Sequence, residues 1–314
     1  MYLDFVNNES LNFSEILREC GFEKEPTSEV LRRISGLEEF YSGSQLTELF
    51  NYILLHSNNY EFLQGVIGLT DFHRDSSTLA ILLDMLLLRI LPRDDSDEQI
   101  NFRVLCAKAI SNYKDTSTLG VLLYCLNNKD ENYKVRLACA DALGRIGDKF
   151  AVAPLINVVK DEEEKSVYVK ESAAFALGLI GDTSAIDPLV EIMQAKQGIW
   201  DKFSFLKEKI VEVLGKLNIN SYKVLGVLKT SLMDSSPIVR INAIEALMNS
   251  EFEEAPDLIR SALKDEDEEV QKNALIALYN LTGRDILDEV ISLPGYSESL
   301  KNEAKCIIEE YEEE

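Results

Sequence analysis

Several residue types that mark other classes of protein are scarce in this 314-residue chain. Seven prolines and fifteen glycines are too few for long disordered segments. The five cysteines contain no CxxC pair, which predicts reduced thiols in a cytoplasmic protein. There are two histidines, and no P-loop, GxGxxG, HExxH, GxSxG or EF-hand pattern. We therefore expect no catalytic residues, no cofactor and no metal site, and hence a protein that is not an enzyme.

Positive charge is also scarce. The chain has 32 Lys and Arg against 55 Asp and Glu, a formal net charge of −23. This disfavours nucleic acid, whose binding relies on cationic side chains that displace counterions, and it disfavours an anionic membrane surface. Residues 251–314 hold nineteen acidic residues and six cationic ones, more than half of the net charge. This segment is either a solvated cap or a docking surface for a basic partner.

Long apolar runs are absent as well. The most apolar stretch, residues 79–91, is interrupted by Asp84 and Arg89, and it is too short to span a bilayer. The first ten residues lack the basic start and apolar run of a signal peptide. We expect a cytoplasmic protein without a membrane partner.

What the sequence does contain is a repeat. An acidic residue is followed six positions later by a cationic one, and the pattern recurs every 31 to 37 residues, the period of a helical solenoid. The pairs are Asp97 and Arg103, Asp130 and Arg136, Glu164 and Lys170, Asp201 and Lys207, and Asp234 and Arg240, followed by Asp265 with Gln271.

Two copies of the repeat are clear, at residues 135–155 and 169–189, and they share Val, Ala, Leu-Gly, Ile-Gly-Asp and Pro-Leu at equivalent positions. The apolar residues follow the spacing of one helical face. Gly147 and Gly181 suit a left-handed helix end, and Pro154 and Pro188 suit the first turn of the next helix. Each repeat is therefore predicted to be two antiparallel helices.

This pattern resembles the HEAT repeat, and most closely the HEAT-like repeat of phycobilisome lyases. The matching features are the turn acids, the Val-Arg or Val-Lys dipeptide, Ala-Leu-Gly, Ile-Gly-Asp and Pro-Leu. The resemblance implies an all-α fold, a right-handed α-solenoid of about eight to nine antiparallel helical pairs. It also implies that the turn acids and helical cations form a structural ladder between neighbouring repeats.

The resemblance divides the chain into three parts. Residues 1–96 are interpreted as divergent N-terminal helical repeats with a cap, because their helical periodicity lacks the repeat signature. Residues 97–282 are interpreted as HEAT-like repeats, and residues 283–314 as an acidic C-terminal helical cap.

Two features are candidate binding surfaces. One is the exposed, concave face of the second helices, where Phe175 and Leu179 would form an apolar spot inside an acidic rim. The other is the longest interval, which places the only tryptophan in a turn that is acidic in other repeats. The alternatives are a solvated face and a tryptophan that covers the core. The candidate protein-binding residues are Leu137, Asp141, Glu171, Phe175, Leu179, Trp200, Phe203, Glu208, Glu212 and Glu245.

Such a surface suits a basic or amphipathic protein segment. We therefore interpret the chain as a non-enzymatic protein-binding scaffold or adaptor. The alternative, implied by the resemblance, is a bilin lyase-type or chaperone-like subunit that assists cofactor attachment to a client protein. A helical-repeat enzyme that binds DNA lesions would need a basic face, which the net charge disfavours.

Overall fold

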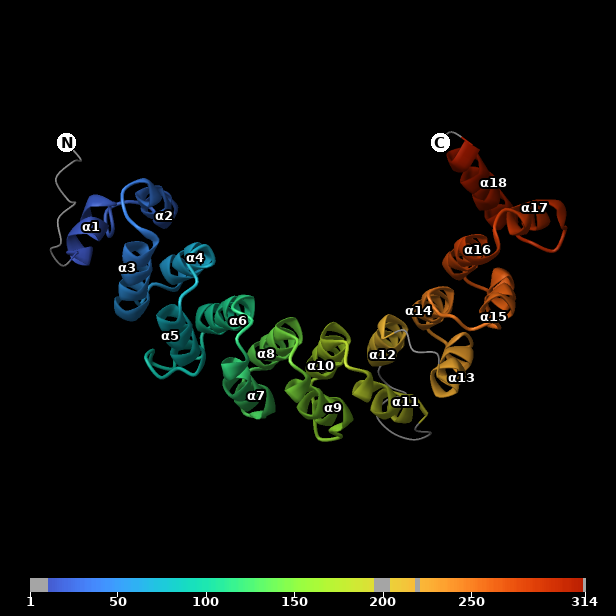
Figure 1. Ribbon diagram of the computed structural model, residues 1–314, viewed down its shortest axis with the longest axis horizontal. Helices are drawn as coiled ribbons and strands as arrows, with labels where there is room; N and C mark the ends of the chain where they lie inside the picture. The colour runs from blue at the N-terminus through green and yellow to red at the C-terminus, as the bar shows by residue number, and fades with distance from the viewer. Residues whose placement is uncertain (1–10, 195–203, 218–220, 313–314) are drawn as a thin grey trace. The chain divides into compact units, whose positions relative to one another are not determined.

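The computed structural model describes residues 11–194, 204–217 and 221–312. Within these ranges the chain forms eighteen α-helices and several short 3₁₀ turns, and it contains no strand. In chain order the described helices make nine successive pairs, which confirms the prediction of an all-α solenoid (Figure 1). The chain divides into two compact units, Met1–Ala142 and Leu143–Glu314.

The helices of the first unit alternate between two layers (Figure 1). Helix α4 packs on α2 and α6, and α3 packs on α5. Helix α8 begins in this unit and ends just inside the next. The bounds are α1 (Phe13–Glu19), α2 (Thr27–Ser35), α3 (Gly43–His56), α4 (Tyr60–Thr70), α5 (Ser76–Leu86), α6 (Asp97–Asn112), α7 (Leu119–Asn127) and α8 (Tyr133–Ile146).

The second unit repeats this arrangement more regularly. Its even-numbered helices α10, α12, α14 and α16 pack side by side in one layer, and its odd-numbered helices form the other (Figure 1). The bounds are α9 (Val152–Lys160), α10 (Val167–Ile180), α11 (Ile186–Gln194), α12 (Ser204–Lys216), α13 (Tyr222–Ser231), α14 (Pro237–Met248), α15 (Ala255–Arg260), α16 (Glu268–Thr282), α17 (Asp285–Ser292) and α18 (Glu298–Glu312).

The Ile-Gly-Asp sequence ends a helix as predicted. Gly147 and Gly181 have φ angles of 81° and 72°, in the left-handed region that glycine adopts without a steric penalty. The aspartates that follow cap the next turn: Asp148 accepts a hydrogen bond from the Phe150 amide, and Asp182 accepts one from the Ser184 amide. These contacts confirm the predicted boundary between the second helix of one repeat and the first helix of the next.

Small residues bring the even-numbered helices of the second unit close together. A Cβ atom on Gly144 would lie 2.7 Å from the Ala176 Cα atom, and one on Gly215 would lie 2.7 Å from the Ala246 Cβ atom. Real Cβ atoms do not approach this closely, so helix packing requires the glycine of Ala-Leu-Gly at position 144 and that of Val-Leu-Gly at position 215.

The predicted ladder exists between repeats, with a correction at its start. Lys207 Nζ lies 3.2 Å from Asp234 Oδ2, and Arg240 Nη2 lies 2.7 Å from Asp265 Oδ1, so each cation contacts the acid of the next repeat. Gln271, in place of a cation, donates to the Asp265 carbonyl oxygen at 2.6 Å.

The correction concerns Asp130 and Asp97. Arg103 pairs with Glu131, at 2.9 and 2.5 Å, and not with Asp130. Asp97 is 88% exposed, and its Oδ1 atom lies 3.8 Å from Lys134 Nζ. Asp130 and Glu131 are adjacent acids in the sequence. The Glu131 side chain reaches the buried Arg103 guanidinium and forms the pair.

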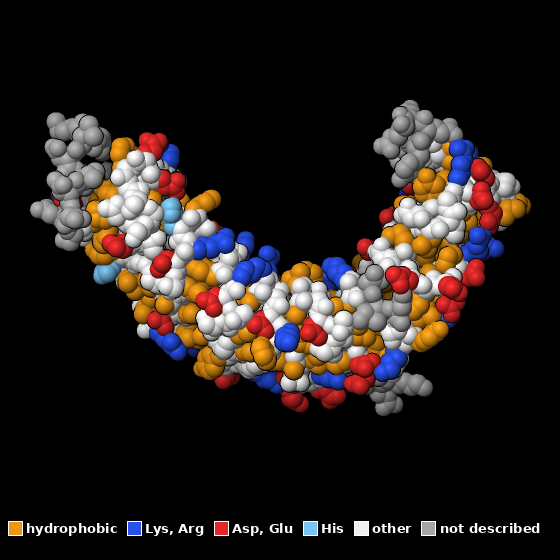
Figure 2. Space-filling model, viewed as in Figure 1, with side chains coloured by type: hydrophobic (Ala, Val, Ile, Leu, Met, Phe, Trp, Pro, Cys, Tyr) orange, Lys and Arg blue, Asp and Glu red, His pale blue; other side chains and the backbone are white. Residues whose placement is uncertain are grey.

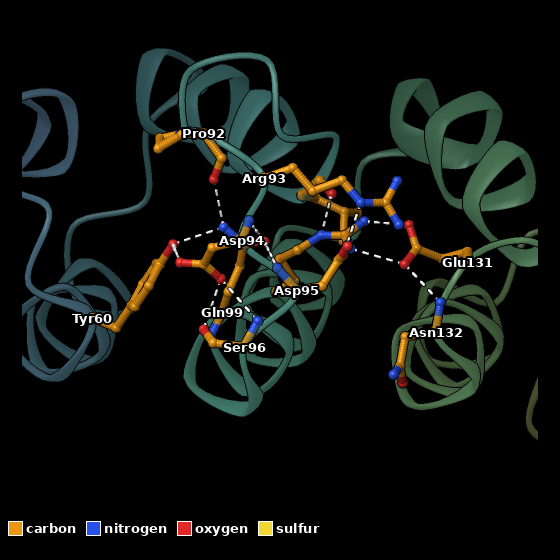
Figure 3. A network of polar contacts seen from close by, with 11 residues as sticks. Tyr60, Pro92, Arg93, Asp94, Asp95, Ser96, Gln99, Glu131 and Asn132 are labelled. Atoms are coloured by element: carbon orange, nitrogen blue, oxygen red, sulfur yellow. Dashed lines mark hydrogen bonds and ion pairs between the residues drawn. The ribbon is translucent and has the colours of Figure 1, made fainter.

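Gln99 and Glu131 belong to a network of polar contacts around the connection between α5 and α6 (Figure 3). Arg103, the partner of Glu131, donates through its Nε atom to the Leu86 carbonyl oxygen at 2.8 Å. The Gln99 amide donates to the Pro92 carbonyl oxygen and the Tyr60 hydroxyl, each at 2.7 Å. The Gln99 and Arg103 side chains are buried, and these bonds supply the partners that buried polar groups require.

Candidate functional site: the face of the even-numbered helices

The candidate surface in the second unit is formed by exposed and half-buried residues of α10, α12 and α14. We call it the even-helix face and define it by Glu171, Phe175, Leu179, Glu208, Glu212 and Glu245. The three helices pack directly on one another, so their outward residues form one continuous surface.

Two lysines contact Phe175 at the centre of this face. Lys209 Nζ lies 4.8 Å from the ring centroid and Lys216 Nζ lies 5.3 Å from it, both within cation–π range. The Glu212 carboxylate accepts a hydrogen bond from each lysine at 2.5 Å. Burial raises the pKa of Glu212, but these two ammonium groups outweigh burial and lower it overall. Phe175 is therefore not the open apolar spot that the sequence predicted, because α12 supplies cations that an acidic rim would lack.

Leu179 is the exposed apolar residue of the face. Its side chain is 45% exposed, and its Cδ1 atom lies over Gly144, where an added Cβ atom would come within 3.2 Å. The glycine leaves room for Leu179 to lie against α8 while keeping part of its surface in solvent. It provides apolar surface one helical turn from Phe175.

Glu171 and Glu208 bring two carboxylates together on neighbouring helices. Burial raises the pKa of Glu171, and the negative charge of Glu208 raises it further, whereas Lys209 lowers it. The Glu171 Oε1 atom is buried without a hydrogen-bond donor among the described residues. Glu208 is held by Ser236, whose hydroxyl donates to it at 2.9 Å. This part of the face has a local excess of negative charge.

The remaining candidate binding residues lie on other parts of the chain. Glu245 is exposed on α14. Leu137 and Asp141 are half-buried on α8, in the first unit. Trp200 and Phe203 lie outside the described residues.

Three exposed apolar residues at one end of the face were not singled out as a set from the sequence. Tyr168, Phe205 and Ile238 each lie two positions before the ladder cation of α10, α12 or α14. The corresponding residues elsewhere are Asn101, Lys134 and Glu269. The sequence signal that indicates this set is a large apolar residue at a position that is polar in the other repeats.

A metal-binding cluster and a membrane-spanning helix are both absent from the parts of the chain that the structure describes. No group of three or more His, Cys, Asp or Glu side chains there is arranged to hold a metal ion. None of the helices there is long and apolar enough to cross a membrane. Acidic side chains are frequent over the C-terminal helices, and hydrophobic and cationic ones lie among them (Figure 2).

Several solved structures are similar to this chain. Kap95p, described as inducing the switch loops of RanGDP to adopt the GTP-bound conformation, is similar over 94% of this chain and 47% of its own, with a TM-score of 0.61 and 13% identity. The YibA protein of E. coli is similar over 78% of this chain and 84% of its own, with a TM-score of 0.50 and 19% identity. The CpcE–CpcF complex of phycocyanin lyase from Nostoc covers 74% of this chain and 87% of its own, with a TM-score of 0.45 and 19% identity.

Sequence comparison gives the family. No curated protein sequence matches the chain. A family profile described as HEAT repeats matches four times, at residues 83–168, 122–202, 201–278 and 225–293. These matches overlap and together extend from residue 83 to residue 293, which is more than half of the chain. The chain belongs to the HEAT-repeat family.

Proposed function

We propose that this protein is a non-enzymatic protein-binding scaffold whose even-helix face binds a basic, amphipathic segment of a partner. The observation that carries the proposal is the pair of neighbouring carboxylates, Glu171 and Glu208, on the same face as the exposed apolar side chain of Leu179. Such a combination fits a segment with one cationic side and one apolar side.

The electrostatics support a cationic partner. A Lys or Arg placed near Glu171 and Glu208 would reduce the repulsion that raises the pKa of Glu171. The net charge of −23 would also attract a basic partner over longer distances at low salt. The two lysines that contact Phe175 also take part in binding. Lys209 and Lys216 can release the Glu212 carboxylate and pair instead with a carboxylate at the edge of the partner segment.

The fold is compatible with this role. Kap95p, which shares the helical solenoid, binds RanGDP. At 13% identity this likeness concerns the fold alone, so the partner must be sought from the chemistry of this chain's own face. Trp200 and Phe203 remain candidate anchors in the connection between α11 and α12.

The alternative is a lyase-type or chaperone-like subunit that assists bilin attachment to a client protein. It is favoured by the Ala-Leu-Gly and Ile-Gly-Asp sequences, which resemble the phycobilisome-lyase repeat. Co-expression with a bilin-binding client would separate the two functions, because only the alternative predicts a rise in covalent bilin absorbance on the client.

The scaffold proposal is tested by selecting binders from a displayed random-peptide library with the full chain. We expect the selected peptides to be enriched in Lys and Arg on one helical side and in Leu, Ile or Phe on the other. Binding of one selected peptide should weaken at least tenfold in Leu179→Glu, a loss of about 1.4 kcal/mol.

Leu293→Glu is the matched control. Leu293 is also 45% exposed in the second unit but lies between α17 and α18, away from the face. Equal affinities of the two variants, or selected peptides without cationic enrichment, would contradict the proposed face.

A further inference from the structure

Tyr168, Phe205 and Ile238 form a repeated apolar feature at one end of the even-helix face, which we call the apolar row. Their side chains are 58%, 63% and 50% exposed, although each is large and apolar. Met233, in the turn before α14, is 86% exposed at the same end. Three neighbouring helices thus present apolar surface to solvent at an equivalent position, which single scattered residues would not do.

Polar contacts hold α12 and α14, which carry Phe205 and Ile238, in register with each other. Each row residue lies two positions before a ladder cation, and Lys207 and Arg240 tie α12 to the turn before α14 and α14 to the turn before α16. The Asn242 amide also donates to the Glu208 carbonyl oxygen at 2.9 Å. Because packed helices lie about 8–10 Å apart, successive row residues are separated by about that distance.

This spacing matches an extended peptide. A chain in the polyproline II conformation has three residues per turn and advances about 3.1 Å per residue, so side chains three positions apart lie on the same side, about 9 Å from one another. Every third side chain of such an extended segment can therefore reach one row residue. The segment would run across the helices, from α10 to α14.

Acidic turns flank both ends of the row. The turn before α10 has four acids, Asp161 to Glu164, against Lys165, and Glu162 and Glu163 are exposed. The turn before α16 and the first two residues of that helix together hold five acids, Asp265 to Glu269, against Lys264. Glu269 occupies the row position on α16 and is exposed. These charges disfavour a second copy of the chain as the occupant and favour a cationic one.

We infer that the apolar row binds an extended peptide segment of a partner, with an apolar side chain at every third position and Lys or Arg beyond each end. The three apolar side chains contact Tyr168, Phe205 and Ile238, and the cations pair with the flanking acidic turns. This inference rests on the proposed function, since it specifies the segment that the even-helix face would take.

The test uses a fluorescein-labelled synthetic peptide with leucine at every third position over three positions, Ser and Thr between them, and two lysines at each end. Fluorescence anisotropy with the full chain should show binding at least tenfold tighter than that of a peptide of the same composition with its three leucines adjacent. Phe205→Ser should weaken binding at least tenfold, because it removes the central contact.

Tyr222→Ser is the matched control, since Tyr222 is an exposed aromatic residue on the odd-numbered helix α13. Both residues are on the surface, and circular dichroism would verify that both variants fold. Equal effects of the two substitutions would overturn the inference, as would equal binding of the two peptides.

Two further outcomes are informative. Tighter binding of a peptide whose leucines recur every seventh residue would overturn the extended conformation. A wild-type dimer that Phe205→Ser dissociates, measured by analytical ultracentrifugation, would assign the row to self-association instead. If binding is lost in Leu179→Glu but kept in Phe205→Ser, the apolar row is wrong while the proposed even-helix face stands.

Discussion

Two ladder contacts at equivalent repeat positions differ in burial. One joins Arg103 of α6 to Glu131 in the first unit, and the other joins Lys207 of α12 to Asp234 in the second. The side chains of Arg103 and Glu131 are 4% and 8% exposed, and the guanidinium fork meets both carboxylate oxygens. Lys207 and Asp234 are 22% and 15% exposed, and the ammonium group approaches one oxygen at 3.2 Å.

The difference follows from the side chains. Arginine offers a planar fork that bonds a carboxylate at two points and still reaches a backbone carbonyl, whereas lysine is a point charge on a flexible stem. A buried ion pair is costly to break because the remaining charge cannot be rehydrated, and a more exposed pair tolerates loss. We therefore expect the buried Arg103–Glu131 pair to contribute more to stability than the more exposed Lys207–Asp234 pair.

Arg103→Ala would test this contrast most strongly. It leaves Glu131 buried without its partner, and we expect a loss of about 3–5 kcal/mol in the free energy of unfolding. Lys207→Ala should cost about 1 kcal/mol or less. Urea denaturation of the full chain followed by circular dichroism measures both, and equal losses would remove the distinction between the two contacts.

The charge of Glu131 accounts for part of that loss. Burial raises its pKa, but the hydrogen bonds from Arg103 and the Asn132 amide outweigh burial and lower it overall. A lowered pKa adds stability above the ordinary glutamate value, and that stability is lost as the pH falls through the lowered pKa. Glu131→Gln should cost about 1.5–3 kcal/mol at pH 7. The difference in the free energy of unfolding between wild type and Glu131→Gln should narrow at acidic pH. A difference that stays constant with pH would contradict the contribution of the Glu131 charge.

Helix packing in the second unit is tested by Gly144→Ala. The added methyl group would meet the Ala176 backbone, so we expect a loss of about 1–3 kcal/mol. Gly226→Ala is the matched change, because nothing lies within 4 Å of a Cβ atom at Gly226 in α13. That variant should gain about 0.5–1 kcal/mol from helix propensity. Thermal and urea unfolding compare the stabilities of the two variants. Equal losses of stability in Gly144→Ala and Gly226→Ala would show that the close approach of the helices at Gly144 does not require glycine.

The smallest expected effect is a gain in stability from Glu171→Gln. The raised pKa of Glu171 means that ionisation is unfavourable in the folded chain, so stability is lost as the pH rises through that pKa. Removing the charge should stabilise the protein at pH 7 by less than about 1 kcal/mol, because solvent screens a half-buried group. The gain should vanish as the pH falls below the ordinary glutamate pKa of about 4.3. Destabilisation at pH 7 would contradict the local excess of negative charge.

The sequence was sufficient where local chemistry decides the outcome. Gly147 and Gly181 end their helices because few other residues adopt the left-handed backbone, and Pro154 and Pro188 lie in first turns because those positions need no amide donor. The period of the acid–cation pairs predicted the solenoid because each repeat is a helical hairpin formed by residues close together in the sequence.

It was insufficient where neighbouring repeats decide the outcome. Choosing Glu131 over Asp130 requires the position of Arg103 on the preceding repeat, and the lysines over Phe175 come from the next helix. The three residues of the apolar row share only their position two residues before a ladder cation, and they differ in residue type. Contacts across repeats depend on helix register, which spacing along the chain does not determine.

Hydrogen–deuterium exchange of the full chain, with and without the triplet-spaced peptide, tests the central claim most directly. The account predicts slower exchange at the N-terminal turns of α10, α12 and α14, where the apolar row and the first residues of the even-helix face lie. Helices α3 to α6 of the first unit should exchange at the same rate in both samples. Protection confined to the first unit, or absent from α12 while the peptide is bound, would contradict it.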